Sequence, residues 1–170
     1  YVTSPIVRNE HRNNILHMTI APAEVSEDVA KEAHELALRL AQGFELAGIL
    51  AIELFVTKDE RVIVNELAPR PHNSGHYTIE ACSFDQFDAH IRGIAGWPLE
   101  QPELLKPAVM VNVLGQHVAP TRALIAEHPE WNMHDYCKAE VRHDRKMGHI
   151  TFVGMDAGEY GAAWADRFVK

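Results

Sequence analysis

Hydrophobic residues recur along this chain with a spacing that changes from segment to segment. Near the N-terminal end they recur every three or four residues, at Val29, Ala33, Leu36, Ala37 and Leu40. This is the spacing of one face of an α-helix. Ser26 is a favourable N-cap, Glu27 and Asp28 suit the first turn, and Gly43 suits a helix C-terminus. The pattern predicts a helix over residues 27–42.

Two β-rich runs follow this helix, from Ile49 to Val56 and from Arg61 to Leu67. Four polar residues join them, which is the pattern of a β-hairpin. The next residues, from Ala68 to His76, are rich in Pro, Gly, Asn and Ser and predict a loop.

The rest of the chain alternates between short strands and helices. Ser83 and Gln86 have the spacing of a capping box, and Gly96 and Pro98 end the helix that follows. Residues 97–107 contain three prolines and predict a linker. The other predicted elements are an extended segment over residues 1–9, strands over 15–20, 108–114, 136–142 and 149–155, and helices over 121–127 and 158–168.

The composition narrows the class of protein. Apolar residues make up 46% and charged residues 24% of the 170 residues, as in an ordinary globular domain. The net charge of −8 argues against nucleic acid or an anionic membrane surface as a partner. No apolar run approaches the ~20 residues of a membrane span. Only Cys82 and Cys137 are present, too few for a disulfide framework or a paired-cysteine zinc site, so we expect a reducing cytoplasm.

Two hairpin carboxylates are the first candidate for chemistry. With a four-residue loop, Val56 faces Arg61, and Glu53 and Glu66 are diagonal neighbours on one face of the hairpin. A loop of three or five residues would turn Glu66 to the other face. Mg²⁺ is commonly held by one or two carboxylates together with substrate phosphates. The pair therefore suggests a metal site, and the alternative is two solvated glutamates.

Two polar clusters are further candidates. The loop after the hairpin carries groups that could contact a ligand, namely Arg70, His72, Asn73 and Ser74. A second cluster brings cations into an otherwise acidic chain, at Lys138, Arg142, Arg145 and Lys146. Such cations suit phosphate oxygens, although an ordinary solvated loop and turn would also explain both clusters.

The loop also carries a family resemblance. The run from Asn65 to His76, followed by Thr78–Cys82 and Gln86–Phe87, closely resembles the signature of the 5-(carboxyamino)imidazole ribonucleotide synthases. These are ATP-grasp ligases, also called ATPase subunits of phosphoribosylaminoimidazole carboxylase. Three further stretches agree, namely His11–Pro22, Gly48–Val56 and Lys138–His149. The resemblance spans essentially the whole chain in order.

The resemblance implies an activity and a fold. Family members use ATP and bicarbonate to carboxylate the exocyclic amine of aminoimidazole ribonucleotide, through carboxyphosphate, in de novo purine biosynthesis. The implied fold is α+β, with the C-terminal half of an ATP-grasp module over residues 1–100 and a small β-rich domain over 107–170. A homodimer is also implied. His143 and Asp144 stand where family members often have a Pro-Gly turn.

Matching positions in the motifs imply roles for individual residues. Mg²⁺ would be held by Glu53 and Glu66. ATP would be contacted by His11, Asn65 and Glu66. The reacting groups would be held by the catalytic residues Arg70, His72 and Asn73, with Ser74 beside them. The ribonucleotide phosphate would be bound by Lys138, Arg145, Arg142 and Lys146.

Members of this family are about twice as long as this chain. We therefore expect the chain to be the C-terminal part of such an enzyme, and alone to bind ATP weakly and turn nothing over. Two alternatives stay open. One is a related ATP-grasp carboxylase or formyl transferase that acts on another ribonucleotide. The other is a truncated, non-catalytic module that binds a phosphorylated nucleotide or a partner chain.

Overall fold

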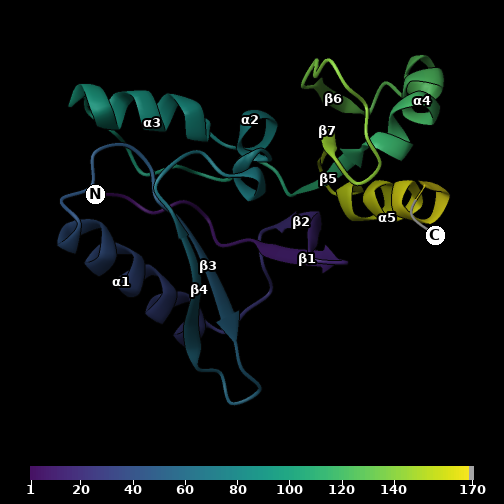
Figure 1. The fold of residues 1–170 in the computed structure, drawn as a ribbon. Coiled ribbons are helices and arrows are strands. Elements are labelled where there is room, and N and C mark those ends of the chain that lie inside the picture. Colours follow the sequence, from purple (N-terminus) through teal and green to yellow (C-terminus); the bar gives the residue numbers. More distant parts are fainter. Residues whose placement is uncertain (169–170) are drawn as a thin grey trace.

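The computed structural model describes residues 1–168, whose strands form two antiparallel sheets (Figure 1). The larger sheet has the order β1-β2-β5-β7-β6. Its strands are β1 (Arg8–Arg12), β2 (Ile15–Ala21), β5 (Ala108–Leu114), β6 (Asn132–Asp135) and β7 (Lys146–Val153). The smaller sheet is a hairpin of β3 (Ala51–Val56) and β4 (Val62–Ala68).

Helices connect and cover these strands. They are α1 (Glu27–Gly43), α2 (Thr78–Ala81), α3 (Gln86–Ala95), α4 (Gly115–Leu124) and α5 (Ala157–Phe168), with short 3₁₀ turns η1 (Asn73–Gly75) and η2 (Ile125–Glu127). Helices beside antiparallel sheets confirm the predicted α+β class.

Strand β5 lies at the centre of the larger sheet and is buried along almost its whole length. Its continuous apolar run is what a strand covered on both faces requires. On one face, Phe152 and Val111 pack with Trp164 of α5. On the other face, Met110 packs with Tyr77 and Ala81, at and within α2. The sheet therefore joins strands β1 and β2 from residues 1–100 with three strands from residues 107–170.

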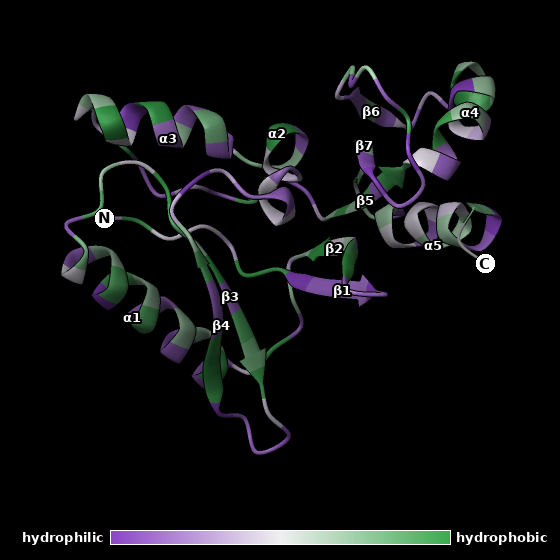
Figure 2. Cartoon of the chain, viewed as in Figure 1, coloured by the Kyte–Doolittle hydropathy of each residue, from purple (hydrophilic) through white to green (hydrophobic). Residues whose placement is uncertain are grey.

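Strand β1 was missed as a strand because its residues are almost all polar. The extended segment predicted over residues 1–9 is wrong in position, since the strand spans Arg8–Arg12. β1 is an edge strand, and charged side chains are typical there because they discourage pairing with another chain. Figure 2 shows this hydrophilic strand beside the more hydrophobic β2.

The capping box predicted at Ser83 is wrong. Asp85 caps α3, and its Oδ1 accepts hydrogen bonds from the Phe87 N–H at 2.7 Å and the Asp88 N–H at 2.9 Å. The short helix α2 precedes this cap and was not predicted. In the predicted capping box, Gln86 would bond back to Ser83 from the first turn. Gln86 is instead the first residue of α3 and is buried.

Two predictions in the C-terminal part also need correction. The strand predicted over residues 136–142 is absent there, and β6 occupies Asn132–Asp135 instead. Cys137 has a φ of 51°, which is incompatible with an extended strand. The helix predicted over 121–127 begins earlier, because α4 starts at Gly115 and η2 covers its predicted end.

Gly115 lies where α4 meets the turn before β7. A Cβ atom at this position would lie 1.9 Å from the carbonyl oxygen of Arg142, so backbone would have to move. We expect Gly115→Ala to lower the free energy of unfolding by about 1–3 kcal/mol. Gly158→Ala in α5 is the matched control, since its Cβ would meet no atom within 4 Å. We expect this control to raise stability by up to about 1 kcal/mol, as measured by urea denaturation, and equal effects would contradict the clash.

Candidate functional site

The hairpin places Glu53 and Glu66 on the same face, as predicted, but its loop length and strand register differ from the prediction. The loop has five residues instead of four, because Val56 pairs with Val62. That register alone would turn Glu66 away from Glu53. A β-bulge with Asn65 as its extra residue restores the parity, so that Glu53 pairs directly with Glu66.

The two carboxylates have different surroundings. The Glu53 side chain is 17% exposed, and its Oε1 lies 3.9 Å from Nε2 of His72. Asn65 Nδ2 donates a hydrogen bond to Glu53 Oε2 at 3.2 Å. Glu66 is exposed to solvent. One carboxylate is therefore held in place and the other is open to a ligand.

This donor set suits a magnesium ion shared with a substrate. Carboxylate oxygens are hard ligands, and two of them leave coordination positions for phosphate oxygens and water. Within residues 1–168, no cluster of three or more His, Cys, Asp or Glu side chains could enclose an ion by itself. The arrangement fits a metal that arrives with phosphate better than a permanent structural metal.

The imidazole of His72 has a defined orientation. Its Nδ1 accepts a hydrogen bond from the N–H of Ser74 at 3.4 Å and lies 2.8 Å from Ser74 Oγ. Because Nδ1 is an acceptor, the ring proton of neutral His72 is on Nε2, which faces Glu53. Burial lowers the pKa of His72, and the nearby Glu53 opposes this effect. His72 is thus a neutral donor directed toward the carboxylate pair.

One predicted cation, Lys146, lies near Glu53, and two further cations lie near Lys146. Lys146 is half-buried, and its pKa is lowered by burial and by the charges of Lys138 and Arg70, while Glu53 raises it. Lys138 Nζ also donates a hydrogen bond to the carbonyl oxygen of Lys146 at 2.6 Å. Of these three predicted cations, Lys146 interacts electrostatically with Glu53, and Lys138 and Arg70 interact with Lys146.

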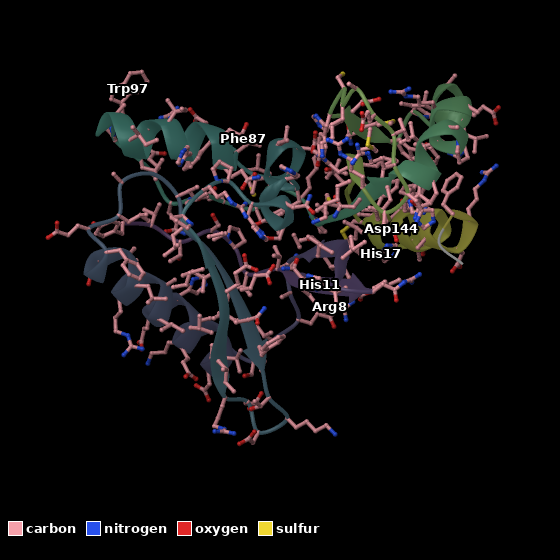
Figure 3. All side chains as sticks on the ribbon, viewed as in Figure 1. Arg8, His11, His17, Phe87, Trp97 and Asp144 are labelled. Carbon is pink, nitrogen blue, oxygen red and sulfur yellow. The ribbon has the colours of Figure 1, made fainter. Side chains whose placement is uncertain are left out.

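Three other predicted residues lie apart from this group. His11 is exposed on β1 (Figure 3). Arg142 forms an ion pair with Glu140, and Arg145 Nη1 donates to the carbonyl oxygen of Glu140 at 3.0 Å. Across the described part of the chain, none of these three has a hydrogen bond or ion pair to Glu53 or Glu66. Their roles in binding ATP or phosphate stay predictions.

Asn73 is fixed by a residue that was not singled out from the sequence. Its side-chain amide forms two hydrogen bonds with Asn112 of β5, at 2.9 and 2.7 Å. Asn112 also donates to the carbonyl oxygen of Leu16, at 2.7 Å. Asn112 is the one polar residue within the apolar run of β5. A polar residue in a buried strand needs a hydrogen-bond partner, and this feature of the sequence could have indicated its role.

Three imidazole rings stack behind the loop. The ring centroids of His76 and His149, and of His149 and His134, are each 4.6 Å apart. Tyr136 Oη lies 2.9 Å from His149 Nδ1, and His134 Nε2 contacts Glu80 Oε1. Burial lowers the pKa of His76 to about 4 and that of His149 to about 3. Both rings are neutral at physiological pH. His149 is a buried polar residue of the core, and His76 is half-buried beside it.

The buried His149 predicts a pH dependence of stability. The unfolded chain protonates this histidine near pH 6.5, whereas the folded protein does so only near pH 3. Stability is therefore highest above pH 6.5 and falls as the pH decreases toward 3, by about 1.4 kcal/mol per pH unit for one proton. Urea denaturation between pH 7 and pH 4.5 measures how the free energy of unfolding depends on pH. In His149→Gln this dependence should be weaker by about 1.4 kcal/mol per pH unit, because one proton fewer is taken up on unfolding. An unchanged dependence would contradict a neutral, buried His149 in the folded protein.

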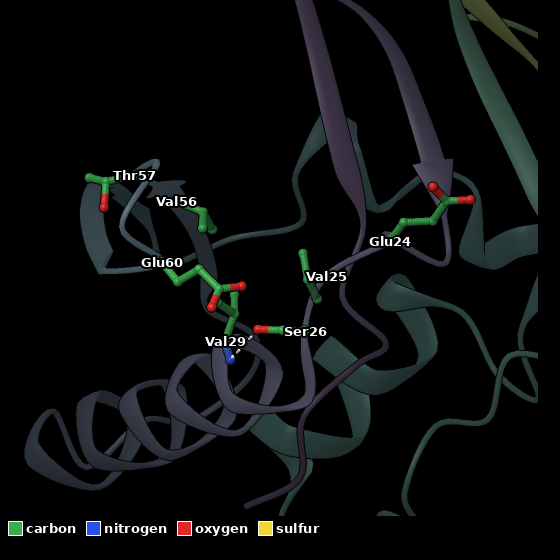
Figure 4. Close-up of a pocket in the computed structure, with 7 residues that line it drawn as sticks. All are labelled: Glu24, Val25, Ser26, Val29, Val56, Thr57 and Glu60. Carbon is green, nitrogen blue, oxygen red and sulfur yellow. Dashed lines mark hydrogen bonds between the residues drawn. The ribbon is translucent and has the colours of Figure 1, made fainter.

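Two hollows in the surface differ in chemistry. The larger, of about 660 Å³, lies between the start of α1 and the hairpin tip (Figure 4). It is lined by Glu24, Val25, Ser26, Val29, Val56, Thr57 and Glu60. These lining residues include two carboxylates and no cation, so this hollow does not suit a phosphate. The smaller, of about 260 Å³, lies beside the β1–β2 turn and includes Arg12, His17 and His117 in its lining.

Comparison with known proteins identifies the family. A family model described as the ATP-grasp domain matches residues 1–87. The chain belongs to the ATP-grasp family. A second family model, the phosphoribosylaminoimidazole carboxylase C-terminal domain, matches residues 108–163. Glu53 and Glu66 thus lie within the ATP-grasp match, and Lys138 and Lys146 lie within the second.

Two relatives of this ATP-grasp chain are named as N5-carboxyaminoimidazole ribonucleotide synthase or synthetase. The chain is 46% identical over 162 residues to the N5-carboxyaminoimidazole ribonucleotide synthase of Bacillus subtilis, covering 93% of this chain and 42% of that protein. The Staphylococcus aureus N5-carboxyaminoimidazole synthetase complexed with ADP has a TM-score of 0.89 at 44% identity, over 96% of this chain and 44% of that one.

A third relative was solved with both nucleotides. The Aspergillus clavatus N5-carboxyaminoimidazole synthase, in complex with ADP and 5-aminoimidazole ribonucleotide, has a TM-score of 0.91 at 32% identity. The match covers 99% of this chain and 48% of that one. The chain therefore spans less than half the length of these relatives.

No helix within residues 1–168 is long and apolar enough to cross a membrane.

Proposed function

We propose that the protein carrying this chain carboxylates 5-aminoimidazole ribonucleotide to 5-(carboxyamino)imidazole ribonucleotide, using ATP and bicarbonate. The observation that carries this proposal is the pairing of Glu53 with Glu66 beside the neutral imidazole of His72 and the cation of Lys146. A reaction between two phosphorylated substrates brings several negative charges together. Phosphoryl transfer depends mainly on positioning and on neutralising such charge.

Glu53 and Glu66 would hold Mg²⁺ against the ATP phosphates, where the ion would neutralise phosphate charge. Asn65 keeps Glu53 oriented through the hydrogen bond from its Nδ2, and together with Glu66 it would contact ATP. His11 is proposed as a further ATP contact.

The first chemical step joins bicarbonate to the terminal phosphate. A bicarbonate oxygen attacks the γ-phosphorus, the bond to the β-phosphate oxygen breaks, and ADP leaves. Arg70, His72 and Asn73 would hold bicarbonate in line for this attack, with His72 donating from Nε2. Ser74 keeps that tautomer by donating to Nδ1.

The second step joins the carboxyl group to the ribonucleotide. The exocyclic amine attacks the carboxyl carbon of carboxyphosphate or of the CO₂ released from it, inorganic phosphate leaves, and the amine loses one proton. The ribonucleotide phosphate would be held by Lys138 and Lys146, with Arg142 and Arg145 as further contacts. Because carboxyphosphate is labile, these groups must also limit the access of water.

We also propose that the protein is a cytoplasmic homodimer. Two free thiols, the buried Cys82 and the exposed Cys137, suit a reducing compartment. An apolar face on α3 offers surface for association, since Ile91 and Ile94 are 59% and 58% exposed.

The decisive experiment measures ATP hydrolysis by the protein that carries this chain, at its full encoded length. We expect phosphate release only when both 5-aminoimidazole ribonucleotide and bicarbonate are present. Hydrolysis stimulated by a different ribonucleotide would favour a related ATP-grasp ligase. Nucleotide binding without hydrolysis would favour a non-catalytic binding module. The 170-residue chain alone is expected to bind ATP weakly and to hydrolyse none.

A further inference from the structure

Gln86, the first residue of α3, brackets the main chain of the loop that carries His72. Its Oε1 accepts a hydrogen bond from the His72 N–H at 2.8 Å, and its Nε2 donates to the His72 carbonyl oxygen at 2.9 Å. One side-chain amide therefore satisfies both main-chain groups of His72, as a neighbouring β-strand would. Gln86 is only 4% exposed, so these hydrogen bonds are shielded from water.

The bracket is connected to the rest of the loop. Gln86 Nε2 lies 3.0 Å from Nδ1 of His76, and the Gln86 N–H donates to Thr78 Oγ1 at 3.0 Å. Thr78 Oγ1 in turn donates to the carbonyl oxygen of Gly75 at 2.6 Å. A Cβ atom on Gly75 would lie 2.4 Å from Gln86 Oε1, which shows how closely the loop fits around this amide.

The loop has a second, independent attachment. While Gln86 holds the main chain of His72 to α3, the amide pair between Asn73 and Asn112 holds the next residue to β5. The hairpin that carries Glu53 and Glu66 belongs to the other sheet. The position of His72 relative to Glu53 is therefore set by the supports of the loop, and Gln86 is the one that contacts His72 itself.

We propose that Gln86 is a positioning residue that holds His72 at its place beside the carboxylate pair. Gln86 contacts His72 and not the reacting atoms, so its effect is transmitted through the loop. This inference rests on the proposed function for its catalytic consequence. Without the amide, the His72 N–H loses its hydrogen-bond acceptor, and the His72 carbonyl oxygen keeps only the hydrogen bond from the Gly75 N–H. The loop then moves to find water or new contacts.

The activity test uses Gln86→Met, which keeps the side-chain length but removes every side-chain hydrogen bond. In the protein that carries this chain, we expect kcat for ribonucleotide-dependent ATP hydrolysis to fall about 10- to 100-fold, because misplacement by about 1 Å can cost that much. The KM for ATP should change less than about twofold, since Asn65 and Glu66 are on the hairpin.

Two controls separate positioning from loss of stability. Val118→Ala removes buried side-chain atoms from α4. It should lower the midpoint of thermal unfolding and leave kcat unchanged at 25 °C. Gln42→Met makes the same chemical change on the exposed surface of α1 and should alter neither quantity. A Gln86→Met protein with normal kcat and a lowered midpoint would overturn the proposal, because Gln86 would then be merely structural.

Amide hydrogen exchange tests the bracket without any activity. In the 170-residue chain, followed by NMR, the His72 N–H should exchange at least tenfold faster in Gln86→Met, with the amides of β7 unchanged. Equal protection of His72 in both proteins would overturn the inference even if the enzyme is active. If the unsubstituted enzyme shows no ribonucleotide-dependent hydrolysis, the proposed function fails, while the exchange result still decides whether Gln86 holds the loop.

Discussion

Glu66→Gln is expected to lower kcat/KM for ribonucleotide-dependent ATP hydrolysis by roughly 10²–10³-fold, the loss typical of removing one group that stabilises transition-state charge. Glu66 is the open member of the carboxylate pair, and the amide of glutamine is a poor ligand for Mg²⁺ beside phosphate. Because Glu66 is exposed, its substitution should change the free energy of unfolding by no more than about 0.5 kcal/mol. Hydrolysis assays and urea denaturation on the same preparations measure both quantities.

The matched control for this substitution is Glu60→Gln, in the loop of the same hairpin. Glu60 is also exposed, but it lies beyond the Val56–Val62 pair, at the far end of the hairpin from the bulge. Its substitution should leave kcat/KM within about twofold of the unsubstituted enzyme, since surface changes away from a site are usually neutral. Equal activity in both variants would contradict a metal-binding role for Glu66 and show that it is simply a solvated glutamate.

Phe152→Ala is expected to cost about 3–5 kcal/mol of unfolding free energy, the usual range for truncating a buried phenylalanine. Phe152 lies in β7, is fully buried, and packs in the cluster that joins α5 to the larger sheet. Domains of ordinary stability have only about 5–15 kcal/mol in total, so this variant should be close to unfolding at 37 °C. Urea denaturation at 25 °C measures the change.

Phe44→Ala is the control for Phe152→Ala, because Phe44 follows α1 and is 59% exposed. We expect its loss to change the free energy of unfolding by about 0.5 kcal/mol or less. If the two substitutions cost the same, the cluster around Phe152 would not be the core of the fold.

The hairpin illustrates how far sequence reasoning reached. Two β-rich runs joined by polar residues located both strands, and the two glutamates were expected on one face. The loop is one residue longer than predicted, which should have separated them, and the bulge at Asn65 compensates. No local sequence pattern predicts that bulge, because its position depends on how the strand bends against its partner strand.

The strand predicted over residues 136–142 failed for a related reason. The composition of these residues is typical of a strand. However, the left-handed backbone at Cys137 does not allow an extended strand to run through this position, and β6 ends before it, at Asp135. The pairing partner of β7 is instead the short polar segment Asn132–Asp135. A short edge strand of this kind forms because it pairs with its neighbour, and its own amino-acid composition hardly predicts that it is a strand.

The amino-acid sequence by itself determined the helix α1, the buried strand β5, the hairpin, and the loop motif that indicates the ATP-grasp family. These features depend on periodicity, capping and composition over short distances. Only the tertiary structure decided the register that pairs Glu53 with Glu66, the attachment of Asn73 to β5, and the bracket that Gln86 forms around His72. Each of these joins residues distant in the chain, and such contacts form only when the packing of the whole core brings the two groups within hydrogen-bond distance.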